Sequence, residues 1–186
     1  MRVIFVAGTD TGVGKTVVTK LLARCFTGEG YKAATQKWVE TGVRKSAAVY
    51  SFKLPASPHL AAKHEGRTIK IDRIKNSLKR LAKKNDIVIV EGTGGLMVPL
   101  TRTKLFIDVI KELNIPVLLV AANRLGAINH TLLSIEALKA RKVKLLGVVF
   151  NSISKKENTL ISEDNPKIVE KFTKKVPIWI SGWQKT

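Results

Sequence analysis

The stretch that most limits how this chain can fold is residues 3–16, VIFVAGTDTGVGKT. Residues 3–7 are uniformly apolar, which is typical of a parallel strand buried on both faces. A glycine-rich turn follows over residues 8–14, and Lys15 and Thr16 then open a helical pattern. A buried strand, a glycine-rich turn and a helix in this order predict a phosphate-binding loop.

The residue types within the turn suit contact with phosphate. Because Gly12 and Gly14 have no Cβ, backbone N–H groups can close around phosphate oxygens, and the following helix N-terminus adds a favourable dipole. Lys15 is expected to reach the β- and γ-phosphates and the Thr16 hydroxyl to coordinate Mg²⁺. Thr9 stands where the usual pattern has its first glycine. An ordinary glycine-rich turn is the alternative, but the adjacent Lys-Thr pair favours nucleotide binding.

Composition is that of a globular protein, and we expect one domain over residues 1–186. Hydrophobic residues make up 45% of the chain, which argues against disorder. The apolar runs are strand-sized, so no membrane span is expected, and the N-terminal run is too short for a signal peptide. The single cysteine, Cys25, lies among apolar neighbours and is predicted to pack in the core. These features predict a cytoplasmic protein.

The charge is strongly positive. Lys and Arg number 33 against 14 Asp and Glu, which gives +19, and the basic residues are dispersed along the chain. Such a field would attract nucleotides, nucleic acid or acidic surfaces. Aromatic residues make up only 6% and no basic-aromatic RNA-binding motif is present. We therefore favour a solvated surface over a nucleic-acid partner.

Strand and helix patterns alternate along the chain. Periodicity and capping signals predict strands over residues 3–7, 31–39, 87–90, 116–122, 145–150 and 176–180. They predict helices over residues 17–29, 58–65, 72–84, 105–113 and 129–140, a last helix opening at Asn165-Pro166, and a loop over residues 42–55. The alternation indicates an α/β fold: a three-layer, doubly wound, mostly parallel sheet with helices on both faces, like that of P-loop NTPases.

Polar residues gather where the predicted strands end. In such a sheet, ligands bind beyond the carboxyl ends of the strands. These ends supply the phosphate loop, Lys37, Glu91, residues 123–129 and Asn151. A carboxylate that ends a buried strand beside a glycine needs a cation or hydrogen-bond donors, so Glu91 is a candidate metal ligand.

Six segments together carry a family resemblance. They are GTDTGVGKT at 8–16, KWVETG at 37–42, SPHLAA at 57–62, VEGTGGLMVPL at 90–100, RLGAINHT at 124–131 and GVVFN at 147–151. With these segments in this order, the chain resembles the dethiobiotin synthetase family. The resemblance implies a ligase of biotin biosynthesis that uses ATP and Mg²⁺ to join CO₂ to 7,8-diaminononanoate. The products would be dethiobiotin, ADP and phosphate, formed through a carbamate and a carbamic-phosphoric anhydride.

The resemblance also implies roles for individual residues. Lys37, Lys15 and Thr11 would be catalytic, with Lys37 bridging carbamate and γ-phosphate. Thr11, Lys37, Thr41 and Asn129 would contact the substrate, and Thr16 and Glu91 would hold Mg²⁺. The nucleotide would be bound by Gly12, Val13, Gly14, Lys15, Thr16, Val17, Glu91, Gly92, Thr93, Gly94 and Asn151, the last reading adenine. The alternatives to these functional roles are structural. Lys37 could be a solvated lysine, the threonines could stabilise turns through their hydroxyls, and the asparagines could be helix or turn caps.

Asn129 implies an assembly as well. In the family its position meets the substrate's carboxylate at a helix N-terminus of the second subunit, so a homodimer is expected. One departure concerns the metal: Ala47 stands where the family has an acidic ligand, and Asp10 and Glu40 are the carboxylates that could compensate. Two other functions are compatible with a phosphate loop of this kind. One is an amidating synthetase of cobalamin synthesis, and the other is a partitioning-type ATPase switch that binds DNA.

Overall fold

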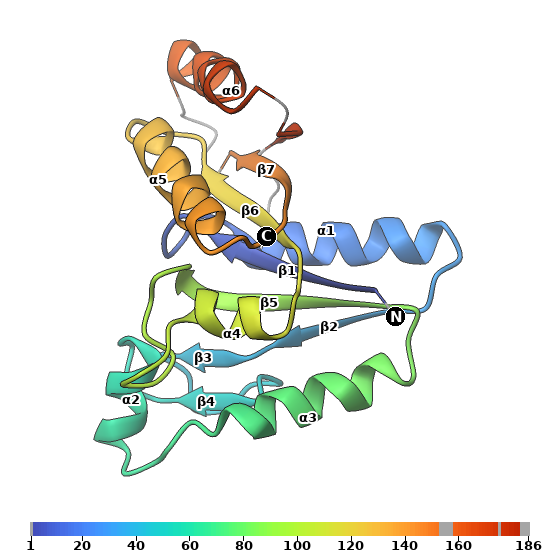
Figure 1. The fold of residues 1–186 in the computed structure, drawn as a ribbon, viewed down its shortest axis with the longest axis vertical. Helices are drawn as coiled ribbons and strands as arrows, with labels where there is room; N and C mark the ends of the chain where they lie inside the picture. Colours follow the sequence, from blue (N-terminus) through green and yellow to red (C-terminus); the bar gives the residue numbers. More distant parts are fainter. Residues whose placement is uncertain (1, 153–157, 175, 183–186) are drawn as a thin grey trace.

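The computed structural model describes residues 2–152, 158–174 and 176–182. Six strands form one parallel sheet in the order β2-β5-β1-β6-β7-β8, and β3 and β4 form a second, two-stranded parallel sheet (Figure 1). The strands are β1 Arg2–Gly8, β2 Ala33–Lys37, β3 Val39–Thr41, β4 Tyr50–Phe52, β5 Ile87–Gly95, β6 Val117–Ala122, β7 Leu145–Asn151 and β8 Ile178–Ser181. The helices are α1 Lys15–Gly28, α2 Pro58–His64, α3 Ile71–Ala82, α4 Phe106–Glu112, α5 Ala127–Ala140 and α6 Thr159–Thr173.

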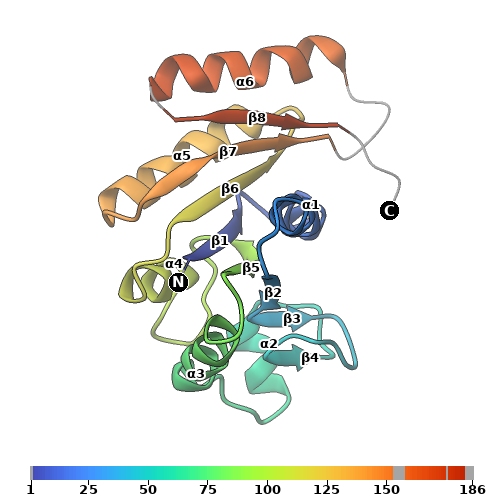
Figure 2. The same cartoon turned by 90° about the vertical axis from the view of Figure 1, so that its right-hand side faces the viewer.

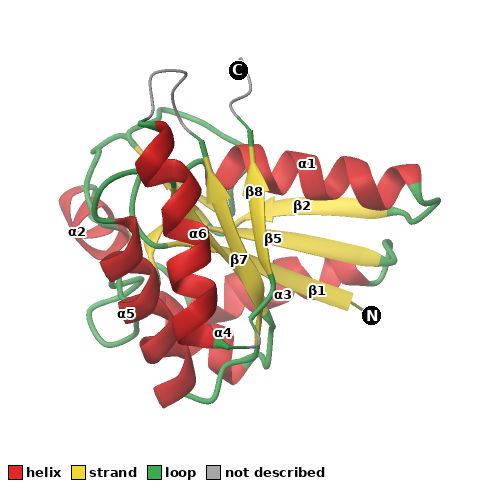
Figure 3. Cartoon of the chain, turned by 90° about the horizontal axis from the view of Figure 1, so that it is seen from above, coloured by secondary structure: helices red, strands yellow, loops and turns green. Residues whose placement is uncertain are grey.

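Helices cover both faces of the large sheet. Figure 2 shows α1 on one side of it and α3, α4 and α5 on the other. The last helix, α6, lies beside α5 and over β8 (Figure 3). The predicted three-layer α/β arrangement is confirmed. In the part of the chain that the structure describes, no helix combines the length and apolar character needed to cross a bilayer.

The hydrophobic core packs against the central strands of the large sheet and extends to β3 through a cluster of aromatic side chains. Strand β5 is fully buried over Val88, Ile89 and Val90, as expected for a parallel strand covered on both faces. Between β2 and β3, the Trp38 ring meets Phe5 edge-on, with ring centroids 4.9 Å apart, and stacks on Phe106, with centroids 6.4 Å apart. This packing fixes the residue between β2 and β3, and therefore the direction in which β2 presents its last residue.

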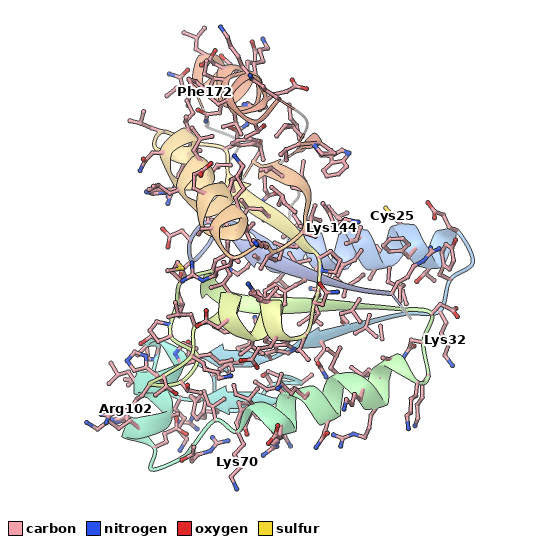
Figure 4. The ribbon with its side chains drawn as sticks, viewed as in Figure 1. Cys25, Lys32, Lys70, Arg102, Lys144 and Phe172 are labelled. Carbon is pink, nitrogen blue, oxygen red and sulfur yellow. The ribbon has the colours of Figure 1, made fainter. Side chains whose placement is uncertain are left out.

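Several predicted segments have other boundaries in the structure. Strand β5 continues past the expected end at Val90 to Gly95, so Glu91 lies within it. The strand expected over residues 31–39 is interrupted at Trp38, whose ring enters the core, and it becomes β2 and β3. The expected loop over residues 42–55 contains β4, which pairs with β3 and packs Tyr50 and Phe52 inside. Cys25 is exposed on α1 rather than buried in the core (Figure 4).

The last helix begins earlier than predicted. Asn158 caps α6 by accepting hydrogen bonds from the backbone N–H groups of Leu160 and Ile161, and Pro166 lies inside the helix. Proline cannot donate the usual hydrogen bond to the carbonyl four residues earlier, which here is that of Ser162. The Asn123 amide donates to that carbonyl instead, at 2.8 Å. The missing donor is therefore replaced from the end of β6.

Candidate functional site

A cavity of about 360 Å³ opens at the carboxyl ends of β1, β2 and β5. The loop after β1 and the start of α1 contribute Thr11, Gly12, Gly14, Lys15, Thr16 and Val17 to its lining. The end of β5 contributes Glu91, Gly92, Thr93 and Gly94, and the turn from β2 to β3 contributes Lys37, Glu40 and Thr41. Segments 75 residues apart in the sequence thus meet at the edge of the sheet where ligands are expected.

The phosphate loop has the backbone that its glycines were predicted to provide. Gly12 and Gly14 have φ of 72° and 89°, in the left-handed region that favours glycine. A Cβ on Gly14 would lie 2.0 Å from Nδ2 of Asn151. That Asn151 amide donates to the carbonyl of Val13 at 3.1 Å. The end of β7 therefore packs directly on the loop, and only glycine leaves room for it.

Lys15 is buried at the base of the loop. Its ammonium donates to the carbonyl of Asp10 at 2.9 Å, and only 8% of the residue is exposed. Burial lowers the pKa of Lys15 to about 8, although the nearby charge of Glu91 acts in the opposite direction. An anion that enters the cavity would therefore stabilise the charged form of Lys15.

Lys37 lies between two carboxylates. Its ammonium is 2.7 Å from Oε1 of Glu40 and 3.2 Å from Oε1 of Glu91. Burial acts to lower the pKa of Lys37, but the hydrogen bond to Glu40 and the charges of both carboxylates outweigh it and raise the pKa. The same contact, together with Ser46, holds the pKa of Glu40 below its usual value against the effect of burial. Lys37 is therefore charged and aligned at the cavity wall.

Thr16 and Glu91 offer two adjacent oxygen ligands. The Thr16 hydroxyl donates to Oε1 of Glu91 at 2.7 Å, and Glu91 is only 5% exposed. Mg²⁺ prefers oxygen ligands, is commonly held by one or two protein groups, and keeps several waters. Among the described residues, no group of three or more Asp, Glu, His or Cys side chains is arranged so that it could hold a metal ion. The pair fits Mg²⁺ completed by phosphate oxygens and water.

Comparisons with known proteins decide the family. A family model described as an AAA domain matches residues 2–179. The ATP-dependent dethiobiotin synthetase of Chlorobaculum tepidum is 44% identical over 173 residues, which cover 81% of this chain and 72% of that protein. A second such enzyme, from Haemophilus influenzae, is 37% identical over 88% of this chain and 98% of its own length. The chain belongs to the ATP-dependent dethiobiotin synthetase family. It is thus an ATP-dependent ligase of a family named for a step of biotin biosynthesis.

Solved structures show the same fold in more distant proteins. A ParA family ATPase from Chlorobium tepidum superposes with a TM-score of 0.62 at 13% identity, over 99% of this chain and 84% of that one. The cell division ATPase MinD of Pyrococcus furiosus gives 0.55 at 19% identity, over 95% and 81%. At these identities the likeness concerns the fold alone. It confirms the predicted fold, which is like that of P-loop NTPases, whereas membership of the dethiobiotin synthetase family favours the ligase over the partitioning-type ATPase.

Most predicted site residues line the cavity, and a few do not. Val13 is buried under the loop, and Asn151 lies behind it with Oδ1 buried and without a hydrogen-bond partner. Thr93 lines the cavity, but its hydroxyl donates a hydrogen bond to the carbonyl of Val39 and so connects β5 to β3. Asn129 is exposed as the third residue of α5, which begins at Ala127 because Gly126 takes a left-handed conformation there.

The structure does not bring Ala47 to the cavity. Ala47 lines a separate hollow beside α3 and is not part of the cavity lining. Besides Glu91, the carboxylate that lines the cavity is Glu40, which the sequence suggested only as a substitute. The signal for it was its position three residues after Lys37, across the turn that Trp38 fixes. Asp10 is not part of the lining.

Proposed function

We propose that this cavity catalyses the ATP- and Mg²⁺-dependent carboxylation and ring closure of 7,8-diaminononanoate to dethiobiotin. One observation supports this more than any other. The charged Lys37 is held between Glu40 and Glu91 on the wall that faces the phosphate loop. A phosphate loop alone would serve any ATPase, but a second lysine opposite it suits a substrate that becomes anionic before it meets ATP.

The proposed reaction has three steps. One amine of the substrate adds to CO₂, which forms a C–N bond, releases a proton and yields a carbamate. A carbamate oxygen then attacks the γ-phosphorus of ATP, so that ADP leaves and a carbamic-phosphoric anhydride forms. The neighbouring amine finally attacks the carbonyl carbon, phosphate departs, and a cyclic urea is closed. Such chemistry depends mainly on alignment and on neutralising charge.

The protein's part in these steps follows from where its groups lie. Lys37 would exchange its contact with Glu40 for the carbamate and the γ-phosphate, while Thr11 and Thr41 would hydrogen-bond the carbamate or the diamine. The ammonium of Lys15 would leave the Asp10 carbonyl for the β- and γ-phosphates. These movements need only side-chain rotation, because each donor already lies at or near the cavity.

Nucleotide and metal would be held by the remaining loop and strand-end residues. Backbone N–H groups of residues 12–17 and 92–94 are expected around the phosphates, and Thr16 and Glu91 would ligate Mg²⁺. When bound, Mg²⁺ offsets the negative charge of the phosphates during transfer. The orphaned Oδ1 of Asn151, which is buried without a partner, is the acceptor expected for the amino group of adenine.

We also propose a homodimer in which Asn129 of one subunit serves the site of the other. Asn129 is exposed and lies outside the cavity of its own chain. On either side of it along the chain, Leu125 and Leu133 are 83% and 62% exposed, which is typical of a surface that a partner covers. The test is light scattering combined with Asn129→Ala, which should raise KM for the diamine with little effect on the affinity for ATP. A fully active monomer would exclude this arrangement.

The function itself is tested by turnover of ATP with components omitted in turn. We expect phosphate release only when ATP, Mg²⁺, bicarbonate and 7,8-diaminononanoate are all present. Lys15→Ala should abolish this release while the circular dichroism spectrum stays unchanged. Release that is independent of the diamine would identify a simple ATPase, and the proposal would then be wrong.

A further inference from the structure

A second hollow, which we call the α3 groove, lies between α3 and β2, the strand at one edge of the large sheet. It has a volume of about 580 Å³ and shares no lining residue with the phosphate cavity. Its floor is formed by Thr35 and Gln36 of β2, and one wall by residues 47–49. The other wall is formed by α3 and the residues that follow it. The groove is therefore bounded by polar groups on its floor and by a helix along its length.

The helix wall is strongly basic. Arg73, Ser77 and Arg80 of α3 line the groove, and their spacing of four and three residues places them within a sector of about 60°. Lys83 and Lys84, which follow the last helical residue, line it as well. No acidic side chain lines the groove. Among the described residues, none of these cations has a carboxylate within ion-pair distance, whereas Lys75 on another face of α3 pairs with Glu112 at 3.4 Å.

The helix dipole explains only part of this cluster. Cations near the C-terminus of a helix are favourable, which accounts for Arg80 and Lys84. Arg73 is the third residue of α3, where the positive end of the dipole disfavours a cation. Its guanidinium is held 4.8 Å from the centre of the Tyr50 ring. By contrast, Lys70, one residue before the helix, extends away from the ribbon in Figure 4. Arg73 is thus positioned along the groove at an unfavourable place on the helix.

One buried polar group at the groove has an unmet hydrogen bond. Gln36 is only 7% exposed, and its amide nitrogen donates to the Ser77 hydroxyl at 2.9 Å. Its Oε1 has no hydrogen-bond partner. Rotation of the amide by 180° lets Oε1 accept from Ser77 and leaves an N–H donor in its place. A buried polar side chain of this kind is normally satisfied, so Gln36 has an unmet hydrogen bond, which a ligand in the groove can meet only after its amide turns outward.

We propose that the α3 groove binds an anion that carries several phosphate groups. Guanidinium groups, ammonium groups and hydroxyls are the donors that phosphate oxygens prefer, and the groove presents all three. Arg73 and Arg80 are about 10 Å apart along α3, since each residue advances 1.5 Å, and Lys84 lies beyond the helix end. Cations distributed along the groove in this way suit an anion with two or more phosphates. This inference is independent of the function of the phosphate loop.

The test uses tripolyphosphate as the probe and backbone amide signals of the ¹⁵N-labelled full chain as the readout. Amides of Thr35, Ser77 and Lys84 report the α3 groove, and those of Gly12 and Gly14 report the phosphate loop, so the two sites are observed separately. We expect saturable shifts in both groups. Shifts confined to the loop would overturn the proposal.

Matched variants distinguish specific binding in the groove from attraction by the overall positive charge of the protein. The double variant Arg80→Gln/Lys84→Gln should weaken binding at the groove about tenfold or more, as expected for at least one lost charge-assisted hydrogen bond. The control Arg24→Gln/Lys79→Gln removes the same two residue types from exposed positions outside the groove. It should change the affinity for the probe at the groove less than twofold. Equal weakening in both would mean a diffuse field and overturn the proposal. Lys84→Gln alone, beyond the last helical residue, repeats the test if the first variant fails to fold.

Two further titrations identify the source of the phosphates. Binding of a ten-nucleotide oligothymidylate in the groove more tightly than tripolyphosphate would support the proposal, with a nucleic-acid backbone as the ligand. Binding of tripolyphosphate alone would support it with a free polyphosphate as the ligand. Hexaglutamate that binds as tightly as either would show that the groove does not select phosphate, and the proposal would fail.

Discussion

The affinity for ATP should fall about tenfold between pH 7 and pH 9, because Lys15 loses its proton in that interval. Burial lowers the pKa of Lys15 to about 8 in the free protein. About nine-tenths of the molecules then carry the ammonium at pH 7 and about one-tenth at pH 9. If only the charged form binds the phosphates, the apparent affinity falls in the same ratio. The sign follows from linkage: bound ATP favours the protonated lysine, so loss of the proton opposes binding. A lysine with the usual pKa of 10.5 would stay charged throughout and give no change.

Isothermal titration calorimetry with ATP in EDTA at constant ionic strength provides the measurement, since omitting Mg²⁺ leaves the charge around Glu91 as the structure has it. The control is Lys15→Arg, whose guanidinium stays charged at pH 9. We expect the pH dependence to disappear in this variant even if its affinity is lower. A wild-type affinity that changes less than twofold, or an equal fall in the arginine variant, would refute the reasoning from Lys15.

Three further changes test other parts of the structure. Lys37→Met should lower kcat at least about 100-fold and leave the Kd for ATP within about threefold, because the proposed contact forms mainly in the transition state; steady-state kinetics and calorimetry separate the two. Gly14→Ala should abolish ATP binding in calorimetry, whereas Gly30→Ala, which also has positive φ but nothing within 4 Å of its Cβ, should cost only about 1 kcal/mol in urea unfolding. Asn123→Ala should lower the free energy of unfolding by about 1–3 kcal/mol, measured in urea, because it removes the donor that replaces the one Pro166 lacks.

The sequence predicted those parts of the site that depend on local pattern. The phosphate loop follows from an apolar strand, positive-φ glycines and a Lys-Thr pair that lie within fourteen residues of one another. Glu91 could be located because a carboxylate that directly follows a buried apolar run needs a cation or hydrogen-bond donors beside it. Both predictions needed only the rule that parallel strands end at the same edge of the sheet.

Features that depend on distant contacts could not be predicted in this way. The N-terminus of α6 was misplaced because Pro166 is tolerated inside the helix only through Asn123, which is 43 residues away in the sequence. The break between β2 and β3 arises because Trp38 packs between Phe5 and Phe106. The same break turns Glu40 back toward Lys37. Periodicity along a single segment contains no information about such partners.

The central claim is most directly tested by following carbon into the product. The protein is incubated with ATP, Mg²⁺, 7,8-diaminononanoate and ¹³C-bicarbonate, and the mixture is analysed by liquid chromatography and mass spectrometry. The account predicts dethiobiotin that is one mass unit heavier, labelled at the ureido carbon and formed in equal amount with ADP. ADP that accumulates without labelled dethiobiotin, or no reaction of the diamine at all, would contradict it.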